Sequence, residues 1–323
     1  MIPGGLVPAA AAAELGDALR TGNLARRLAR AALSSSTIEE SAPPDEAWLA
    51  RELFAAAPPA PTAPYAWADL GGAASVTDQV WHLDPVHIAV GLDSAIVQSV
   101  DAAPPDAAES DALISAARDC LAAAGCRIER LAGRWFLHTT RAWNMSPSSL
   151  AAALGRPLTL ASPDDGDALA WSRAHNMIQM SWHEHPVNLA REARGVLTVS
   201  GAWLHGGGTY RPLPALPWRH VASERAEVRG AARAAGATAG VEATSADRAL
   251  LLWDDVLPAS RTAEWASWRA AMARIEQRIA ALPASSELDL ILTGQRRVKR
   301  WRVLTSDRLR LWRSRSLAEA CAE

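Results

Sequence analysis

Apolar residues recur at helical spacing in several parts of the chain. Leu24, Leu28 and Ala31 in "LARRLARAAL" predict one helix, and "DEAWLARELF" predicts another, with Asp45 as its N-cap. A third follows in "GDALAWSRAHNMIQMSWHEH", where Leu169, Trp171, Ala174, Ile178 and Trp182 form the expected buried side. Two more helices are predicted in "SERAEVRGAARAAG" and "AEWASWRAAMARIEQRIAAL".

Alternating patterns predict strands between these helices. "VWHLDPVHIAVGLDSAIVQSV" is typical of two strands with a turn near Gly91 to Ser94, and a helix and two further strands joined at Gly133 are expected next. Later strands are expected in "VLTVSGAWLHGGG", "ALLLWDDVL", "LDLILTG" and "KRWRVLT". Such alternation of strands and helices predicts a layered α/β fold. The Pro-rich "AAAPPAPTAPYA" is expected to be a loop or linker and marks a candidate boundary.

Composition excludes few classes of function. The net charge is −2 and 21% of the 323 residues are charged, which favours a folded protein without a general attraction to nucleic acid or anionic membranes. No apolar stretch reaches membrane-spanning length, and the N-terminus lacks the basic region of a signal peptide. Three cysteines without metal-binding spacing favour a reduced, cytoplasmic protein.

The densest group of polar residues lies around Pro186. Proline suits the first turn of a helix, so the preceding helix should break at His185 and a new one should run to Gly195. Asn188 and Arg191 then share one face of this short helix, where a helix N-terminus and a guanidinium favour a phosphate or carboxylate. We expect ligand-binding residues here and in the following strand, namely His183, His185, Asn188, Arg191, Trp203, Gly206, Gly207 and Gly208.

Each of these residues also has a plain structural interpretation. His183 could satisfy a buried carbonyl, Arg191 could pair with Glu184 or Glu192, and three glycines in a row are commonly a flexible turn. The two histidines lie two positions apart, on opposite sides of a helix, so joint chelation of one metal is not expected.

Three segments carry a resemblance to a known family. "DPVHIAV", "HNMIQMSWHEHPVNLAREARG" and "AWLHGGGTYRPLP" resemble proteobacterial regulatory proteins of the RpfE type, which are often described as cofactor-independent phosphoglycerate mutases. More distantly, the chain resembles the archaeal type of that mutase, in the alkaline phosphatase superfamily. The resemblance implies an alkaline-phosphatase-like layered α/β domain with an inserted small α/β subdomain. It implies residues 1–75 as the N-terminal helical part of the main domain, 76–160 as the insert and 161–323 as the rest of the main domain.

The resemblance implies a two-metal mechanism with Asp and His ligands, from which this sequence departs. The chain begins "MIPGGLVP" where the family has Asp-Gly, and "QRRVKRWR" follows "LDLILTG" where the family has Asp-His. We therefore expect a degenerate relative with a regulatory role, a pseudoenzyme that binds an anionic metabolite, phosphorylated or carboxylated, or a protein partner. The alternative is an active mutase or phosphatase that uses Mn or Mg with Asp254, Asp255 and scattered histidines such as His82, His87 or His220.

A basic stretch near the C-terminus suggests a third possibility. Arg296, Arg297, Lys299, Arg300 and Arg302 surround Trp301, which is a mixture of charge and stacking surface used by nucleic-acid binders. The competing interpretation is an edge strand whose charges prevent aggregation. We favour the edge strand and expect no nucleic-acid partner, because acidic residues balance the whole chain.

Overall fold

The computed structural model describes the chain except residues 16–22, 92–93, 158–165, 243–247, 284–286 and 310–316. It is a mixed α/β protein with several sheets, as the alternating pattern predicted. Internal contacts divide it into two compact units. Unit 1 holds residues 1–58, 215–224 and 237–323, and unit 2 holds residues 59–214 and 225–236. No helix in the described residues has both the length and the apolar character needed to cross a membrane.

Unit 1 is built on an antiparallel sheet in the order β1-β11-β10, formed by Ala32–Ile38, Arg297–Val303 and Leu288–Thr293. Ile2 adds a parallel bridge to Leu292. One face of this sheet carries Leu292 and Trp301, which are buried in a core with Leu28, Trp268 and Ile275. The helices of the unit are α1 (Ala9–Leu15), α2 (Asn23–Leu28), α3 (Pro44–Glu52), α10 (Leu257–Thr262), α11 (Trp265–Ala281), α12 (Leu317–Cys321) and the 3-10 helix η1 (Thr305–Leu309).

A second, parallel sheet in unit 1 has the order β8-β7-β9, with strands Thr238–Gly240, His220–Ala222 and Ala249–Leu251. The predicted long helix in the C-terminal third is confirmed as α11, with Trp268, Ala271, Met272, Ile275 and Ile279 on its buried side. The predicted N-cap of α3 was wrong. Pro43 holds that position and Asp45 lies buried in the first turn, because a proline pair starts this helix.

Unit 2 contains a five-stranded antiparallel sheet. The long strand β2 (Gln79–Val90) pairs along one edge with β6 (Gly201–Gly208) and along the other with β5 (Arg134–Thr139) and β3 (Ala95–Ser99). Strand β4 (Cys126–Leu131) pairs with β5 across the tight turn at Gly133, as predicted. The predicted hairpin between β2 and β3 is also confirmed, since the Gly91 amide donates to the Ser94 carbonyl, although residues 92–93 lie outside the described part.

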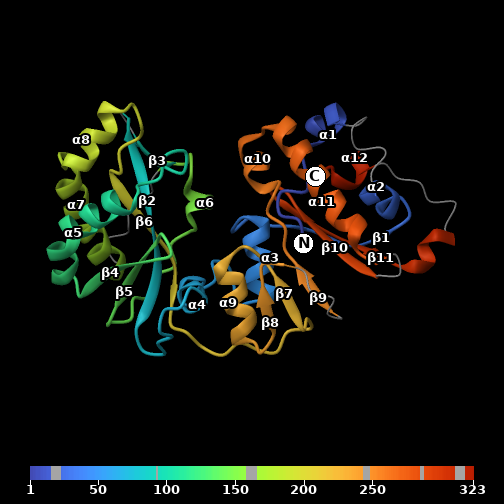
Figure 1. The fold of residues 1–323 in the computed structure, drawn as a ribbon, viewed down its shortest axis with the longest axis horizontal. Helices are drawn as coiled ribbons and strands as arrows, with labels where there is room; N and C mark the ends of the chain where they lie inside the picture. The colour runs from blue at the N-terminus through green and yellow to red at the C-terminus, as the bar shows by residue number, and fades with distance from the viewer. Residues whose placement is uncertain (16–22, 92–93, 158–165, 243–247, 284–286, 310–316) are drawn as a thin grey trace. The chain divides into compact units, whose positions relative to one another are not determined.

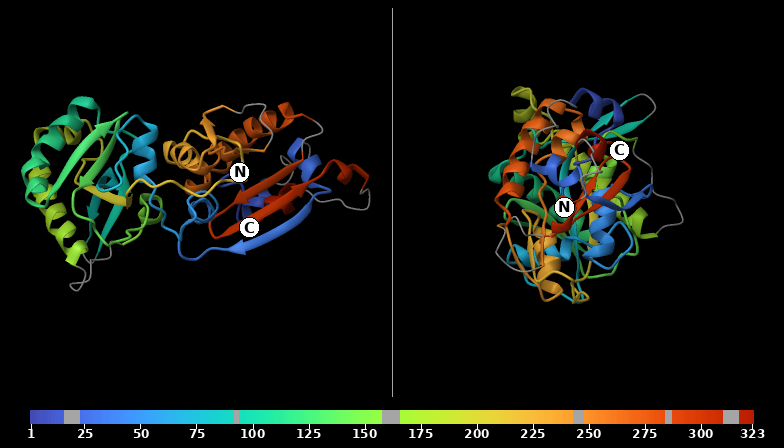
Figure 2. Two further views of the ribbon diagram at one scale, coloured as in Figure 1. Left: turned by 90° about the horizontal axis from the view of Figure 1, so that it is seen from below. Right: turned by 90° about the vertical axis from the view of Figure 1, so that its right-hand side faces the viewer.

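Helices cover both faces of this sheet (Figures 1 and 2). On one face, Trp81, Leu83, Leu137 and Leu204 pack under α5 (Ala107–Ala123) and α7 (Gly166–His183). On the other, Val80 and Phe136 pack under α4 (Ala63–Asp69) and α9 (Ala226–Ala234). Two short helices complete the unit, α6 (Leu150–Ala153) and α8 (Pro186–Ala193). Part of the predicted Pro-rich loop is therefore the helix α4.

The borders of unit 2 differ from those expected for the insert. The unit takes in α7, α8 and β6, which follow residue 160, because β6 forms an antiparallel ladder with β2 from Val80 to Val86. It also takes in α4 and α9, which pack against each other. The first border, between Pro58 and Pro59, falls inside the predicted Pro-rich segment.

Candidate functional site

The region around Pro186 folds locally as its sequence predicts. Helix α7 ends at His183, and α8 starts at Pro186 with His185 as its N-cap and ends before Gly195, which has a positive φ of 69°. The Nδ1 atom of His185 accepts a hydrogen bond from the Val187 amide at 3.2 Å. This bond uses one of the amides that the helix N-terminus offers to a ligand.

Asn188 and Arg191 lie on one face of α8, as expected, but this face is buried. Asn188 is 2% exposed, and its side-chain amide donates to the carbonyls of Trp182 and Val199, at 2.8 Å each, while its oxygen accepts from the Val199 amide. The side chain thereby joins the end of α7 to the chain entering β6. Three hydrogen bonds within the protein give Asn188 a structural role.

Arg191 is 1% exposed and is held from three directions. Its Nε donates to the Leu197 carbonyl at 2.8 Å, Nη2 to the Ala103 carbonyl at 2.5 Å, and Nη1 to Glu109 Oε2 at 2.8 Å. Neither Glu184 nor Glu192 is the partner that the sequence suggested. An external anion does not reach this guanidinium in the conformation described, because protein atoms surround it.

Glu109 links this corner to the start of α5. It occupies the third position of that helix in a capping box with Asp106, and it also accepts a hydrogen bond from Arg194. Burial acts to raise the pKa of Glu109, but the hydrogen bonds from Arg194, Arg191 and the Asp106 amide outweigh it and lower the pKa. The carboxylate therefore stays ionised and neutralises Arg191.

The remaining predicted residues are dispersed. His183 is exposed at the end of α7, and the indole N–H of Trp203 donates to the Ser148 carbonyl at 2.9 Å. Gly206, Gly207 and Gly208 lie in β6, so they do not form the flexible turn considered for them. A Cβ on Gly207 would lie 2.0 Å from the Trp81 ring, and one on Gly208 would lie 2.7 Å from Pro61. Close packing on both faces of the strand explains these glycines.

A different group of polar side chains lies on the α4/α9 face of the unit 2 sheet. It combines a buried histidine, a histidine–aspartate pair and an arginine–glutamate pair on the four elements β2, β5, β6 and α9. We call it the polar cluster, and its members are His82, Asp84, Arg134, His205 and Glu227.

The cluster follows from the pairing of three strands. His82 stands opposite His205 on β6 and opposite Phe136 on β5, so that its ring lies 4.9 Å from the His205 ring and 5.5 Å from the Phe136 ring. His205 Nε2 and Asp84 Oδ2 are 2.7 Å apart. The Thr62 hydroxyl also approaches, since a Cβ on Gly206 would lie 2.3 Å from it and 3.1 Å from the His82 ring.

Burial and neighbouring charges shift the pKa values of His82 and Asp84. Burial, together with the charges of His205 and Arg134, holds the pKa of His82 well below its usual value, so this ring is neutral near pH 7. Burial acts to raise the pKa of Asp84, but the hydrogen bond and charge of His205 outweigh it and lower the pKa. Arg134 donates from Nη1 to Glu227 at 3.2 Å.

Several donors of the cluster lack an acceptor. His82 is 2% exposed, and within the described part of the chain neither of its ring nitrogens has a hydrogen-bond partner. The same holds for Nδ1 of His205, and for Nε and Nη2 of Arg134. The side chains of Asp84 and Arg134 are 33% and 37% exposed, so solvent reaches one side of the cluster. Imidazole and guanidinium N–H groups suit the oxygens of a small anion.

Sequence reasoning considered His82 alone among these residues. The alternation Trp81-His82-Leu83-Asp84 places His82 and Asp84 on one strand face, which was a usable signal. His205 lies 121 residues beyond Asp84, and nothing local in the sequence pairs their strands.

The side chains considered as metal ligands for the enzyme alternative are bonded to other protein groups. Asp255 is held by Arg278 at 2.7 Å and lies 3.7 Å from Arg274. His220 uses Nδ1 on the Thr238 hydroxyl and Nε2 on the Glu242 carbonyl, and His87 contacts Thr198. In the described ranges, no group of three His, Cys, Asp or Glu side chains is arranged to hold a metal ion. Asp255 and His220 therefore do not fit a two-metal centre.

The basic C-terminal stretch is not an edge strand, which corrects that interpretation. Strand β11 lies between β1 and β10, and its charges are paired on the sheet. Arg300 and Arg302 both contact Asp289, Arg296 contacts Glu40, and Lys299 contacts the Ala322 carbonyl. The hydrogen bonds from Arg302 and Arg300 lower the pKa of Asp289 against the effect of its partial burial.

Comparison with known proteins shows likeness at the level of structure only. No protein-family model matches the sequence, and no curated protein matches it. Among solved structures, the chain is similar to the PH0037 protein from Pyrococcus horikoshii, with 14% identity, 95% of this chain and 88% of that chain covered, and a TM-score of 0.55. A cofactor-independent phosphoglycerate mutase from Thermoplasma acidophilum gives 13% identity, coverage of 89% and 84%, and a TM-score of 0.39. The first likeness concerns the fold alone.

Proposed function

We propose that this chain is a phosphoglycerate-mutase-like protein that binds a small phosphorylated or carboxylated metabolite and acts in regulation. The proposed site is the polar cluster of unit 2, since Asn188 and Arg191 are occupied by protein atoms. The observation that carries the proposal is the set of unpartnered N–H donors on His82, His205 and Arg134, gathered beside a partly exposed edge.

The relation to the mutase is part of the proposal. It rests on the three sequence segments that resemble the RpfE-type regulatory proteins and, more distantly, the archaeal mutase. We propose on this basis that unit 1 is a degenerate alkaline-phosphatase-like domain and that unit 2 contains the inserted region. The arginine contacts of Asp255 support a degenerate centre, because a carboxylate neutralised by guanidinium groups is a poor ligand for a divalent cation.

The charges of the cluster suit a ligand of modest negative charge. The carboxylates of Asp84 and Glu227 lie beside His205 and Arg134, so an anion meets no large excess of positive charge. Recognition then depends on hydrogen-bond donors, of which His82 is already buried in the folded protein. Each charge-assisted hydrogen bond contributes about 1.5–3 kcal/mol.

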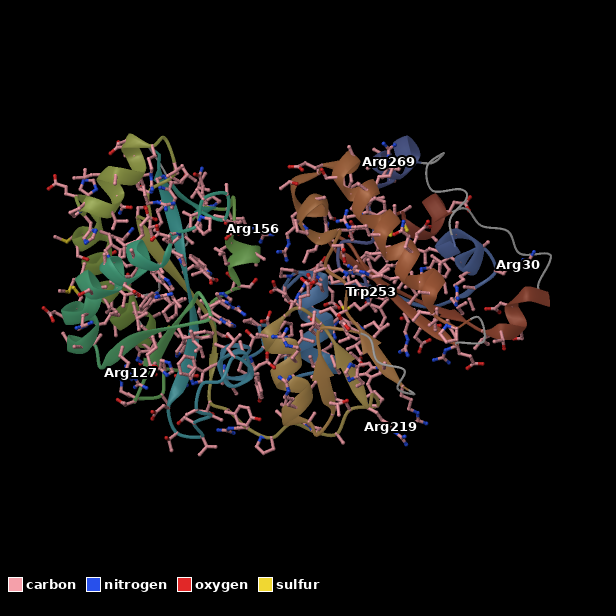
Figure 3. The ribbon with its side chains drawn as sticks, in the orientation of Figure 1. Arg30, Arg127, Arg156, Arg219, Trp253 and Arg269 are labelled. Atoms are coloured by element: carbon pink, nitrogen blue, oxygen red, sulfur yellow. The ribbon has the colours of Figure 1, made fainter. Side chains whose placement is uncertain are left out.

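Calorimetric titration with 3-phosphoglycerate tests this proposal. Glycerol 3-phosphate and glycerate, which carry phosphate alone and carboxylate alone, identify the group recognised. Replacing Arg134 by Gln should weaken binding about 10- to 100-fold. The matched control is Arg127→Gln. Arg127, labelled in Figure 3, lies on the neighbouring strand β4. Its side chain is 53% exposed and pairs with Glu129.

Two results would contradict the proposal. Equal affinity in the Arg134 and Arg127 variants would remove the cluster from the binding site. Clear Mn²⁺-dependent mutase or phosphatase turnover, abolished by Asp255→Asn, would support the metal-dependent enzyme instead.

A further inference from the structure

Glu227 contacts Arg134, the residue of the polar cluster with the most hydrogen-bond donors. The Nη1 atom of Arg134 donates to Glu227 Oε2 at 3.2 Å, which ties the start of α9 to β5. Nε and Nη2 of the same guanidinium have no acceptor in the described part of the chain. Arginine–carboxylate pairs are commonly bidentate, with two parallel hydrogen bonds. This contact has one, so it is the weaker form of such a pair.

The Glu227 side chain presents the same chemical group as a carboxylated metabolite. Burial acts to raise the pKa of Glu227, but the charges of Arg134 and Arg225 and a hydrogen bond from its own amide outweigh it and lower the pKa. Glu227 lies in the first turn of α9, whose N-cap residue, Arg225, makes no side-chain capping bond. A carboxylate is stabilised at such a helix N-terminus. The protein therefore places a carboxylate of its own where Arg134 and α9 favour one.

This contact can open without displacing α9. The side chains of Glu227 and Arg134 are 20% and 37% exposed, so solvent reaches the pair and the glutamate side chain has room to rotate outward. The helix itself is held separately, because it packs on α4 and Arg229 donates two hydrogen bonds to Asp69, at 3.0 and 2.6 Å. Rotation of one side chain is therefore enough to free Arg134 Nη1.

The unpartnered donors of the cluster lie close to this contact. Arg134 Cζ lies 5.9 Å from the centre of the Phe136 ring, and the His82 ring lies 5.5 Å from the same ring. The His82 and His205 rings are 4.9 Å apart. Phe136 thus has the guanidinium and an imidazole as neighbours, and one ligand can contact both.

We propose that Glu227 is an internal competitor, and that a carboxylate of the ligand replaces its carboxylate on Arg134 Nη1. The inference rests on the proposed function and specifies which group of the metabolite binds there. The position already accommodates one negative charge, whereas a phosphate group carries about 1.5 to 2 negative charges near pH 7. The additional charge would be repelled by the carboxylate of Asp84 in the same cluster. Charge therefore favours a carboxylate at Arg134, and the affinity reflects the exchange of one carboxylate for another.

The experiment compares two variants of Glu227 by calorimetric titration of the full chain with glycerate and with glycerol 3-phosphate. Glu227→Gln removes the charge, and Glu227→Asp keeps the charge but withdraws the carboxylate from Arg134 by one methylene. Both variants should bind glycerate about 10-fold more tightly than the unmodified protein, because the competing hydrogen bond is weakened or lost. The gain for glycerol 3-phosphate should be smaller. Circular dichroism and the melting temperature show whether each variant remains folded.

The control is Glu129→Gln, which removes a carboxylate that is 40% exposed and pairs with Arg127 on β4, and which should leave both affinities unchanged. Two results would overturn the competition. A gain in the Gln variant alone, larger for glycerol 3-phosphate, would show general charge repulsion. Unchanged or weaker glycerate binding in both Glu227 variants would show that Glu227 merely positions Arg134.

The same titrations separate this inference from the proposed function. If Arg134→Gln weakens glycerate binding and the Glu227 variants do not strengthen it, the binding site stands and the competition is wrong. Absence of glycerate binding in the unmodified protein and in both Glu227 variants would contradict the site and the competition together.

Discussion

Arg191 Nη1 lies 2.8 Å from Glu109 Oε2, across 82 residues of sequence, in a corner where the arginine is 1% exposed. This contact fixes α8 to the beginning of α5. From the sequence, the Arg191 guanidinium was expected to bind a ligand. In the structure the same guanidinium is used for a contact within the protein. The consequence is a set of variants that distinguishes stability from binding.

Replacing Arg191 by Met should lower the free energy of unfolding by about 3–5 kcal/mol, the cost of breaking a buried ion pair from one side. The Leu197 and Ala103 carbonyls would lose their donor at the same time. Urea denaturation measures the change. Arg194→Ala removes a second arginine from the same carboxylate, but that side chain is 55% exposed, so the expected loss is below about 1 kcal/mol. Similar losses in both variants would contradict the structural role.

The sequence predicts the local part of this architecture well. Pro186 starts α8, Gly195 follows its end, and Ala174, Ile178 and Trp182 are buried on α7, because capping and helical periodicity act within a few residues. It also places Asn188 and Arg191 on a common helix face. The sequence does not show whether that face is buried or exposed. Its burial depends on contacts with Glu109, Ala103 and Val199, which are distant in the sequence.

The polar cluster could not be predicted from local sequence patterns, because its residues come from elements that are distant in the sequence. His82 and His205 meet only because β6 pairs with β2, and the ladder joins segments about a hundred residues apart. The strand β1 was missed because its serine-rich pattern has no apolar face, and part of it was assigned to the preceding helix. Its strand conformation depends on pairing with β11.

Gly207 should tolerate no side chain. Gly207→Ala would place a Cβ 2.0 Å from the Trp81 ring, which is 1% exposed and packed on every side. We expect a loss of about 1–3 kcal/mol from overpacking, measured by thermal or urea denaturation. Gly166→Ala is the control, because a Cβ there meets no atom within 4 Å and α7 begins at this residue. A phosphate-binding turn would predict the reverse, with stability unchanged and ligand affinity reduced.

His175 should make stability depend on pH. Burial lowers the pKa of His175 to about 4, from 6.5, and its Nε2 accepts a hydrogen bond from the Ala202 amide at 3.1 Å. Between these two pH values the unfolded chain binds more protons than the folded one. The contribution of His175 to the free energy of unfolding is therefore fully present above pH 6.5 and is lost as the pH falls toward 4. The difference corresponds to about 3 kcal/mol.

The variant His175→Gln keeps an acceptor for the Ala202 amide but does not titrate. Its free energy of unfolding should therefore fall less steeply than that of the unmodified protein as the pH drops from 6.5 to 4. His183→Gln, at an exposed position, should follow the unmodified curve. Parallel curves for all three proteins would show that His175 does not carry the effect.

Anion binding at the polar cluster should be coupled to proton uptake at His82. Burial and the charges of His205 and Arg134 lower the pKa of His82, and a bound anion opposes the effect of those charges, so the pKa rises in the complex. A group whose pKa is higher in the complex binds protons on association, and affinity for glycerate, whose carboxylate stays ionised near neutral pH, therefore increases as the pH falls, by at most about tenfold per pH unit.

Calorimetry in buffers of different ionisation enthalpy counts these protons directly. His82→Gln should reduce the number taken up, whereas His87→Gln, on the same strand but bonded to Thr198, should leave it unchanged. Because the phosphate also titrates, glycerate provides a ligand without that contribution. Equal proton uptake in the two variants with glycerate would place the anion away from His82. Affinity for glycerate that rises with pH would contradict the coupling to His82.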